Sequence, residues 1–98
     1  MTIEQRLQTL GITLPPVAVP AAAYVPFVRT GNQIFLSGHI AKKDGQVWVG
    51  KLGQNMTTDE GKLAARAVAI DLMGTLAVAA GGLDKVVRIV KVMSLVNS

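Results

Sequence analysis

The stretch YVPFVRTGNQIFLSGHI, residues 24–40, decides how the rest of this chain must fold. Two apolar runs, residues 24–28 and 33–37, flank a short polar link in which Gly31 stands where a left-handed residue would be needed. This spacing predicts a β-hairpin closed by a type I turn with a glycine bulge. We therefore take the hairpin as the starting point from which the other elements are placed.

The second strand of this hairpin runs into Ser37, Gly38 and His39. A small hydroxyl, a residue without Cβ and the only imidazole of the chain follow one another there. A strand exit of this kind can present backbone N–H groups and polar tips to a small ligand. The sequence thus suggests a binding site at the hairpin exit.

Composition indicates one globular domain that hides part of its surface in an assembly. The chain has 98 residues, of which 50% are hydrophobic and 16% charged. Soluble domains usually contain about 25% charged residues. We therefore expect residues 1–98 to form a single domain that associates with copies of itself.

The net charge of +4 raises nucleic acid as a partner, but the basic residues are dispersed. Only Lys42 and Lys43 are adjacent, and one Trp, one Tyr and two Phe give no aromatic platform for stacking bases. A solvated basic surface is the favoured interpretation, and nucleic acid is not an expected partner. The basic residues are Arg6, Arg29, Lys42, Lys43, Lys51, Lys62, Arg66, Lys85, Arg88 and Lys91.

Without cysteine and with a single histidine, the sequence offers no disulfide framework, no thiolate nucleophile and no Cys- or multi-His metal site, so no cofactor is expected. The uncharged run of residues 7–28 is long enough for a membrane span, but four prolines break it as a helix. The N-terminus has no signal-peptide pattern. We expect a cytoplasmic protein without a membrane partner.

Capping boxes mark two helices. Thr2 and Gln5 open a short helix that Gly11 can end, and a Pro- and Ala-rich extended segment, residues 14–23, follows it. Thr57 and Glu60 open a long helix from about residue 58 to residue 80, ended by a Gly pair. Because this helix is apolar nearly all round, we expect it to be buried on more than one side.

The rest of the chain reads as strands and turns. Residues 42–45 form a polar turn, residues 47–49 a short strand and residues 50–56 a loop. Residues 83–96 are apolar on both faces, which predicts a buried central strand, parallel to an earlier strand through a right-handed crossover. The fold class is α+β, with a helix packed on a mixed sheet. One long helix covers only one sheet face, so neighbouring subunits should cover the other.

Several of these features together resemble the RidA/YjgF family, the reactive-intermediate deaminases, also known as endoribonuclease L-PSP proteins. The resemblance rests on Tyr24 and its hairpin, on Ser37-Gly38, on the Thr57 capping box with its Ala-rich helix, and on the sequence AGGL at residues 80–83 followed by an apolar strand. Order and spacing match from about Tyr24 to the end of the chain. Residues 1–23 resemble the N-terminal extension of one subgroup.

The resemblance implies a chorismate-mutase-like fold, a homotrimer and ligand sites in the clefts between subunits. Family members hydrolyse enamines and imines such as 2-aminoacrylate to a 2-keto acid and ammonia. By this resemblance the substrate-binding residues are Tyr24, Ser37, Gly38 and His39. Such chemistry is plausible without metal, because a positioned water, backbone donors and a proton relay suffice.

Two departures from the family pattern leave the activity open. His39 stands where the family usually has Gln, and it is either a proton shuttle or a hydrogen-bonded structural residue. The family domain continues past the position of Ser98, and the resemblance puts its carboxylate-binding arginine in that later part, so no catalytic residue is assigned. The alternatives are a non-catalytic ligand-binding or regulatory trimer and, following the older family name, RNA cleavage or binding.

Overall fold

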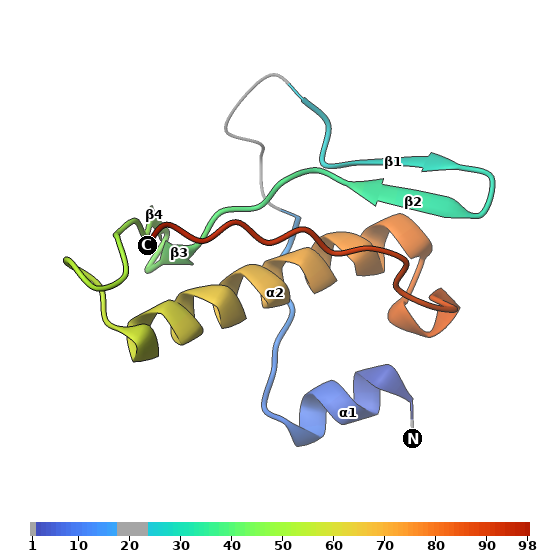
Figure 1. Cartoon of the computed structure of the whole chain (residues 1–98). Helices are drawn as coiled ribbons and strands as arrows, with labels where there is room; N and C mark the ends of the chain where they lie inside the picture. Colours follow the sequence, from blue (N-terminus) through green and yellow to red (C-terminus); the bar gives the residue numbers. More distant parts are fainter. Residues whose placement is uncertain (1, 18–23) are drawn as a thin grey trace.

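The structure is a computed structural model that describes residues 2–17 and 24–98. A long helix, α2 (Thr58–Ala80), is contacted by two small antiparallel hairpins, β1 (Phe27–Thr30) with β2 (Gln33–Leu36) and β3 (Lys42–Lys43) with β4 (Gln46–Val47). Figure 1 shows the hairpins on one side of α2 and the short helix α1 (Ile3–Thr9) on the other. The predicted α+β class, with helix packed on sheet, is confirmed.

The first hairpin forms where the sequence predicts it, but with a tighter turn. Thr30 pairs with Gln33, which leaves a two-residue loop of Gly31 and Asn32. Gly31 has φ 56°, whereas Asn32 is not left-handed. This φ pattern belongs to type II′ turns, which have Gly first. The predicted type I turn with a glycine bulge is wrong, because the tighter turn matches the right-handed twist of the strands.

The β1–β2 hairpin has apolar side chains on both faces. Phe27 pairs with Leu36, and both are half-buried on the face that also carries Ile34. The next pair, Val28 and Phe35, points to the opposite face and is 53% and 58% exposed. Helix α2 contacts β1 and β2 and can cover only one of these faces.

The capping signals read from the sequence are confirmed. Thr57 Oγ1 accepts the Glu60 N–H at 3.1 Å, and Glu60 Oε1 accepts the Thr57 N–H at 3.0 Å. Thr2 and Gln5 form the same reciprocal box at α1. At its C-terminus α2 ends at Gly81, whose left-handed φ of 79° explains why glycine is needed there.

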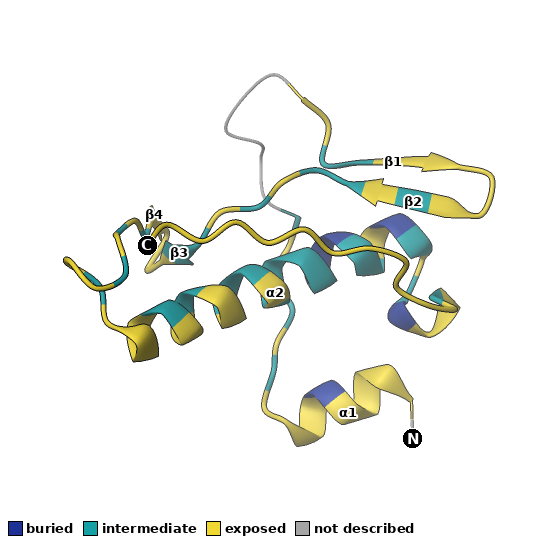
Figure 2. Cartoon of the chain, in the orientation of Figure 1, coloured by how far each residue is buried: buried dark blue, intermediate teal, exposed yellow. Residues whose placement is uncertain are grey.

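The expectation that α2 is buried on more than one side is wrong for the described chain. Gly74, Thr75 and Ala79 are its buried residues, whereas Leu63 and Val78 are both 59% exposed (Figure 2). By length and composition alone, α2 would be able to cross a membrane, and 17% of its most apolar window is buried. Core helices of globular proteins meet the same criterion, and α2 contacts both hairpins.

The N-terminal segment crosses α2 at Gly74. A Cβ placed on Gly74 would lie 2.7 Å from the Pro15 carbonyl oxygen, so only glycine permits this crossing. Helix α1 is held nearby, with Leu7 buried and the Ile3 N–H donating to Asp84 Oδ1 at 3.0 Å. The predicted extended segment at residues 14–23 lies partly outside the described residues, at 18–23.

The largest correction concerns residues 83–96. They begin with a 3₁₀ turn, η1 (Leu83–Lys85), and no strand is formed in residues 86–98. Val87, Val90 and Leu95 are 96%, 81% and 90% exposed, so the predicted buried central strand and its parallel pairing are absent here. The physical reason is that a strand apolar on both faces needs ladder neighbours and two covering layers, and α2 supplies one layer at most.

The polar segment after the first hairpin also differs in detail. Lys42 and Lys43, predicted to be in a turn, form β3, and the turn itself is Asp44-Gly45. The predicted strand at residues 47–49 is shorter and begins earlier, as β4. The following loop receives the end of the chain, because Asn97 Nδ2 donates to the Gly50 carbonyl at 3.0 Å and the Leu52 N–H donates to the Asn97 carbonyl at 3.0 Å.

Candidate functional site

Ser37 ties the entrance of the first hairpin to its exit. The Ser37 N–H donates to the Pro26 carbonyl at 3.0 Å, and the Ser37 hydroxyl donates to the Val25 carbonyl. These bonds bring Tyr24 and Val25 beside Ser37 and Gly38. We call Tyr24, Val25, Ser37, Gly38 and His39 the hairpin shelf.

His39 connects the hairpin shelf to α2. Its Nδ1 lies 2.8 Å from the Ser37 carbonyl oxygen, and its Nε2 lies 3.0 Å from Thr75 Oγ1. Thr75 is 1% exposed, and its hydroxyl also lies 3.3 Å from the Asp71 carbonyl oxygen. Both ring nitrogens of His39 are therefore engaged within the fold, which favours its structural role over a freely exposed proton shuttle.

The outer side of the shelf is open. Tyr24 is 45% exposed, and Gly38 is exposed with no atom within 4 Å of a Cβ placed on it. The Gly38 N–H has no hydrogen-bond partner within the part of the chain that the structure describes. The structure thus gathers the four predicted substrate-binding residues at one end of the hairpin, together with a backbone donor that has no partner in the described chain, and their ligand role stays a prediction.

Sequence reasoning missed Thr75. It is the only hydroxyl in the 67–80 segment, which is apolar apart from Asp71, and it stands between Gly74 and Leu76. A buried hydroxyl needs a hydrogen-bond partner, and the only imidazole of the chain is the partner it has. The isolated threonine was the available signal, but its partner lies 36 residues away and no local pattern identifies it.

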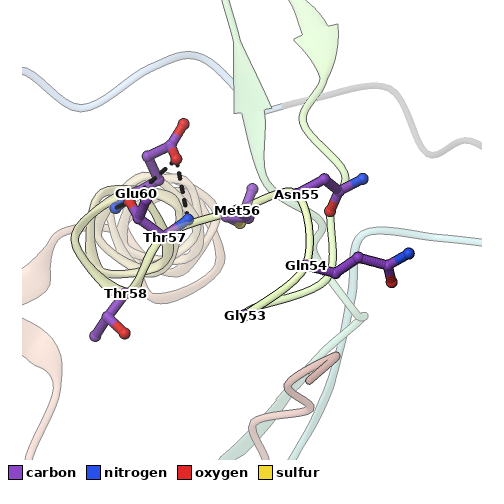
Figure 3. A pocket seen from close by; sticks show the side chains of 7 residues that line it. All are labelled: Gly53, Gln54, Asn55, Met56, Thr57, Thr58 and Glu60. Atoms are coloured by element: carbon purple, nitrogen blue, oxygen red, sulfur yellow. Dashed lines mark hydrogen bonds between the residues drawn. The ribbon is translucent and has the colours of Figure 1, made fainter.

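A hollow of about 370 Å³ lies at the N-terminus of α2, away from the hairpin shelf (Figure 3). The carboxylate of Glu60 lies at this helix end. The pKa of Glu60 is lowered by the Thr57 N–H, then by the Thr57 hydroxyl, and further by the positive charge of Lys43. An ionised carboxylate there repels anions and already binds the capping donors. The lining residues are Gly53, Gln54, Asn55, Met56, Thr57, Thr58 and Glu60. We therefore rank this hollow below the hairpin shelf.

Metal chemistry has no ligand set in residues 2–17 and 24–98. No group of three or more His, Cys, Asp or Glu side chains that would hold an ion occurs there. The polar atoms at the shelf are hydroxyl, imidazole and backbone groups. Such groups orient a small polar ligand through hydrogen bonds.

A helix laid on a hairpin, with its polar shelf at the hairpin exit, belongs to the α+β class with a chorismate-mutase-like fold. The family described as "YjgF/chorismate_mutase-like, putative endoribonuclease" matches residues 4–98. The chain belongs to this YjgF family, which confirms the resemblance found in the sequence.

Individual relatives agree with the assignment. Protein TCP17 of Trypanosoma cruzi is 43% identical over 97 residues, which cover 98% of this chain and 61% of that protein. A solved structure from Shewanella oneidensis, described as a putative endoribonuclease, matches with a TM-score of 0.75 and 33% identity, over 82% of this chain and 54% of that one. Atu1372 of Agrobacterium tumefaciens, of unknown function, matches with a TM-score of 0.73 and 34% identity, over 89% and 54% of the two chains. This chain thus spans a little over half the length of these relatives.

Proposed function

We propose that this chain takes part in hydrolysing small reactive enamines and imines of the 2-aminoacrylate type to a 2-keto acid and ammonia. Membership of the YjgF family supports the proposal, as does the hairpin shelf. The observation that carries it is Gly38, an exposed residue without a side chain whose N–H has no hydrogen-bond partner in the described chain. Such a donor suits the carboxylate that every 2-imino acid carries.

The proposed reaction requires few functional groups from the protein. The enamine takes a proton at carbon to become an imine, water adds across the C=N bond, and the resulting aminol loses ammonia to leave the keto group. The carboxylate is unchanged throughout, so a fixed donor can hold the substrate during each step. Holding substrate and water in one geometry supplies much of the rate enhancement available to such a reaction. We assign no catalytic arginine within residues 1–98.

Copies of the chain complete the site in this proposal. The shelf is open on one side, and the outward face of the hairpin carries exposed Val28 and Phe35. Exposed apolar side chains of this kind are commonly buried against another copy of the same chain in a symmetric oligomer. We propose a homotrimer in which a neighbouring copy covers this face and forms the second wall of the ligand cleft.

The proposal is tested by ammonia release from 2-aminoacrylate generated in situ by a pyridoxal-phosphate enzyme, measured above the spontaneous rate. Gly38→Ala should lower kcat/KM about 10- to 100-fold, because a methyl group on the neighbouring Cα crowds a carboxylate that approaches the amide and weakens a charge-assisted hydrogen bond. Thr58→Ala is the matched control, since Thr58 lines the hollow at the N-terminus of α2 and makes no capping bond through its side chain. Ammonia release at the spontaneous rate with the wild-type chain would refute the activity.

Two alternatives have distinct results in the same experiments. A non-catalytic ligand-binding trimer would bind pyruvate at the shelf without accelerating ammonia release. An RNA-directed function is suggested by the word endoribonuclease in the family description, whereas the dispersed basic residues and the few aromatic residues disfavour it. RNA binding or cleavage that persists at moderate salt would support it, because non-specific phosphate contacts weaken steeply with salt.

A further inference from the structure

We propose that the buried hydroxyl of Thr75 is a positioning group: it holds the His39 ring in place against the Ser37 carbonyl, and His39 in turn fixes the direction in which the Gly38 N–H points. The role of Gly38 as a ligand donor rests on the proposed function. The tautomer and the orientation of the peptide do not, and they follow from three contacts within the fold.

Counting hydrogens assigns the tautomer. The Ser37 carbonyl oxygen, 2.8 Å from His39 Nδ1, can only accept, so Nδ1 carries the hydrogen. In the neutral ring Nε2 is then a bare acceptor. Its partner at 3.0 Å is Thr75 Oγ1, which has a single hydrogen to donate. The other acceptor near that hydroxyl, the Asp71 carbonyl, lies further away at 3.3 Å.

The burial of Thr75 supports this assignment of its hydrogen bond. Thr75 is 1% exposed in the most buried part of α2, beside Gly74, and an unpaired hydroxyl there would cost free energy. Within residues 2–17 and 24–98 no buried side-chain nitrogen or oxygen lacks a partner. A hydroxyl at this depth, where the neighbouring side chains of α2 are apolar, is best explained by the bond it makes to His39.

The contact between His39 and the Ser37 carbonyl also determines the orientation of the Gly38 N–H. The Ser37 carbonyl and the Gly38 N–H belong to the same peptide unit, and no peptide bond in the described chain is cis. In a trans peptide the C=O and N–H point in opposite directions. When His39 Nδ1–H holds the carbonyl on its own side, the Gly38 N–H must point to the other side.

The rest of Ser37 is held as well. Its N–H donates to the Pro26 carbonyl and its hydroxyl to the Val25 carbonyl, so the contact from His39 is the last one needed to prevent the 37–38 peptide from turning over. Thr75, on the buried side of α2, thereby determines the direction of the Gly38 N–H at the molecular surface. This also explains how His39 acts in the site without touching a substrate.

The experiment uses the full chain labelled with ¹⁵N-histidine. Because the chain has one histidine, its ring nitrogens give a single unambiguous set of signals. They are read at a pH high enough that the shifts no longer change, so that the neutral ring is observed. We expect a protonated Nδ1 and a bare, hydrogen-bonded Nε2. A wild-type ring with its hydrogen on Nε2 would overturn the proposal without any variant being needed.

Two substitutions separate the hydroxyl from the shape of the side chain. Thr75→Ser keeps the hydroxyl and should keep the ring on the Ser37 carbonyl in its Nδ1–H form. Thr75→Val removes the hydroxyl, so the ring can leave the carbonyl and a mixture of tautomers should appear. With pyruvate as the probe, followed at the Gly38 amide, Thr75→Val should weaken binding about fivefold, as expected for one hydrogen bond, and Thr75→Ser should restore it. Thermal melting checks that both variants fold.

The outcomes distinguish this proposal from the function on which it partly rests. A wild-type ring in the Nδ1–H form in a protein that does not bind pyruvate would refute the proposed function and leave the positioning contact intact. Unchanged tautomer and unchanged pyruvate affinity in Thr75→Val would refute the positioning role and leave the function standing.

Discussion

Thr57 and Glu60 show how much a single pair of residues determines. Threonine followed three residues later by glutamate or glutamine predicts a helix start, because each side chain satisfies the backbone N–H of the other. Both capping boxes of this chain were predictable in that way and are formed as expected. Thr75 was not predictable, since the hydroxyl and its imidazole partner are far apart in sequence.

The capping box of α2 should make helix stability depend on pH. The Thr57 N–H and hydroxyl, aided by the charge of Lys43, lower the pKa of Glu60. A folded-state pKa below the unfolded value means that the contribution is fully present above the unfolded pKa and is lost as pH falls through the folded one. Circular dichroism melts from about pH 7 to about pH 3 should show this loss.

Glu60→Gln provides the matched comparison, because its amide oxygen can still accept the Thr57 N–H but does not titrate in this range. The difference in melting temperature between wild type and Glu60→Gln should therefore narrow or reverse as the solution becomes acidic. Parallel curves for the two proteins would show that the carboxylate adds nothing through its charge.

Among the elements, α2 contains two glycines that pack against different kinds of neighbour. A Cβ on Gly74 would lie 2.7 Å from a backbone oxygen of Pro15, whereas a Cβ on Gly61 would lie 2.8 Å from Cδ2 of Leu52, at the end of a flexible side chain. The helix itself was predictable from its caps and composition. The crossing at Gly74 was not, because nothing in the local sequence identifies Pro15 as its neighbour.

The same substitution at these two glycines should have opposite consequences. Gly74→Ala must push the N-terminal segment off the helix and should lower the free energy of unfolding by about 1–3 kcal/mol. Gly61→Ala needs only a rotation of Leu52 and gains helix propensity, so it should be neutral or stabilising by up to about 1 kcal/mol. Urea unfolding measures both. Equal effects would show that the Pro15 contact is not maintained in solution.

Residues 86–96 show where sequence periodicity fails for an element. Apolar residues on both faces correctly indicate a segment that favours extended backbone, but the existence of a strand depends on neighbours that the pattern does not contain. Within the described chain these neighbours are absent and the segment is exposed. The proximity of the candidate site residues was easier to predict, because Ser37, Gly38 and His39 are adjacent in sequence and the hairpin brings Tyr24 to them; their ligand role stays a prediction.

For the whole molecule, exposed apolar surface is the main feature. It lies on the outward face of the first hairpin, at Val28 and Phe35, and along residues 86–96. The high proportion of apolar residues and the low proportion of charged residues predicted such a surface. The residues that form it could be identified only from the register of the hairpin. The family assignment accounts for the fold and leaves the assembly as a proposal.

A charge on this surface should break the proposed trimer. Phe35→Lys puts an ammonium group into the proposed interface, where its desolvation is unfavourable, so the mass measured by light scattering should fall about threefold at equal concentration. Gln54→Lys adds a charge of the same sign in the exposed loop before α2 and should leave the mass unchanged. A wild-type chain that stays monomeric at high concentration would refute the trimer.

The open segment at residues 86–96 also bears on how this polypeptide must be handled. Its Val-rich sequence VVRIVKVMSLV is of the kind that stacks into cross-β fibrils when left unpaired. Arg88 and Lys91 interrupt it at short intervals and act as gatekeepers, since like charges in register repel one another. Replacing both with neutral residues changes nothing in the hairpin or α2, and it should raise the tendency of the chain to form such fibrils.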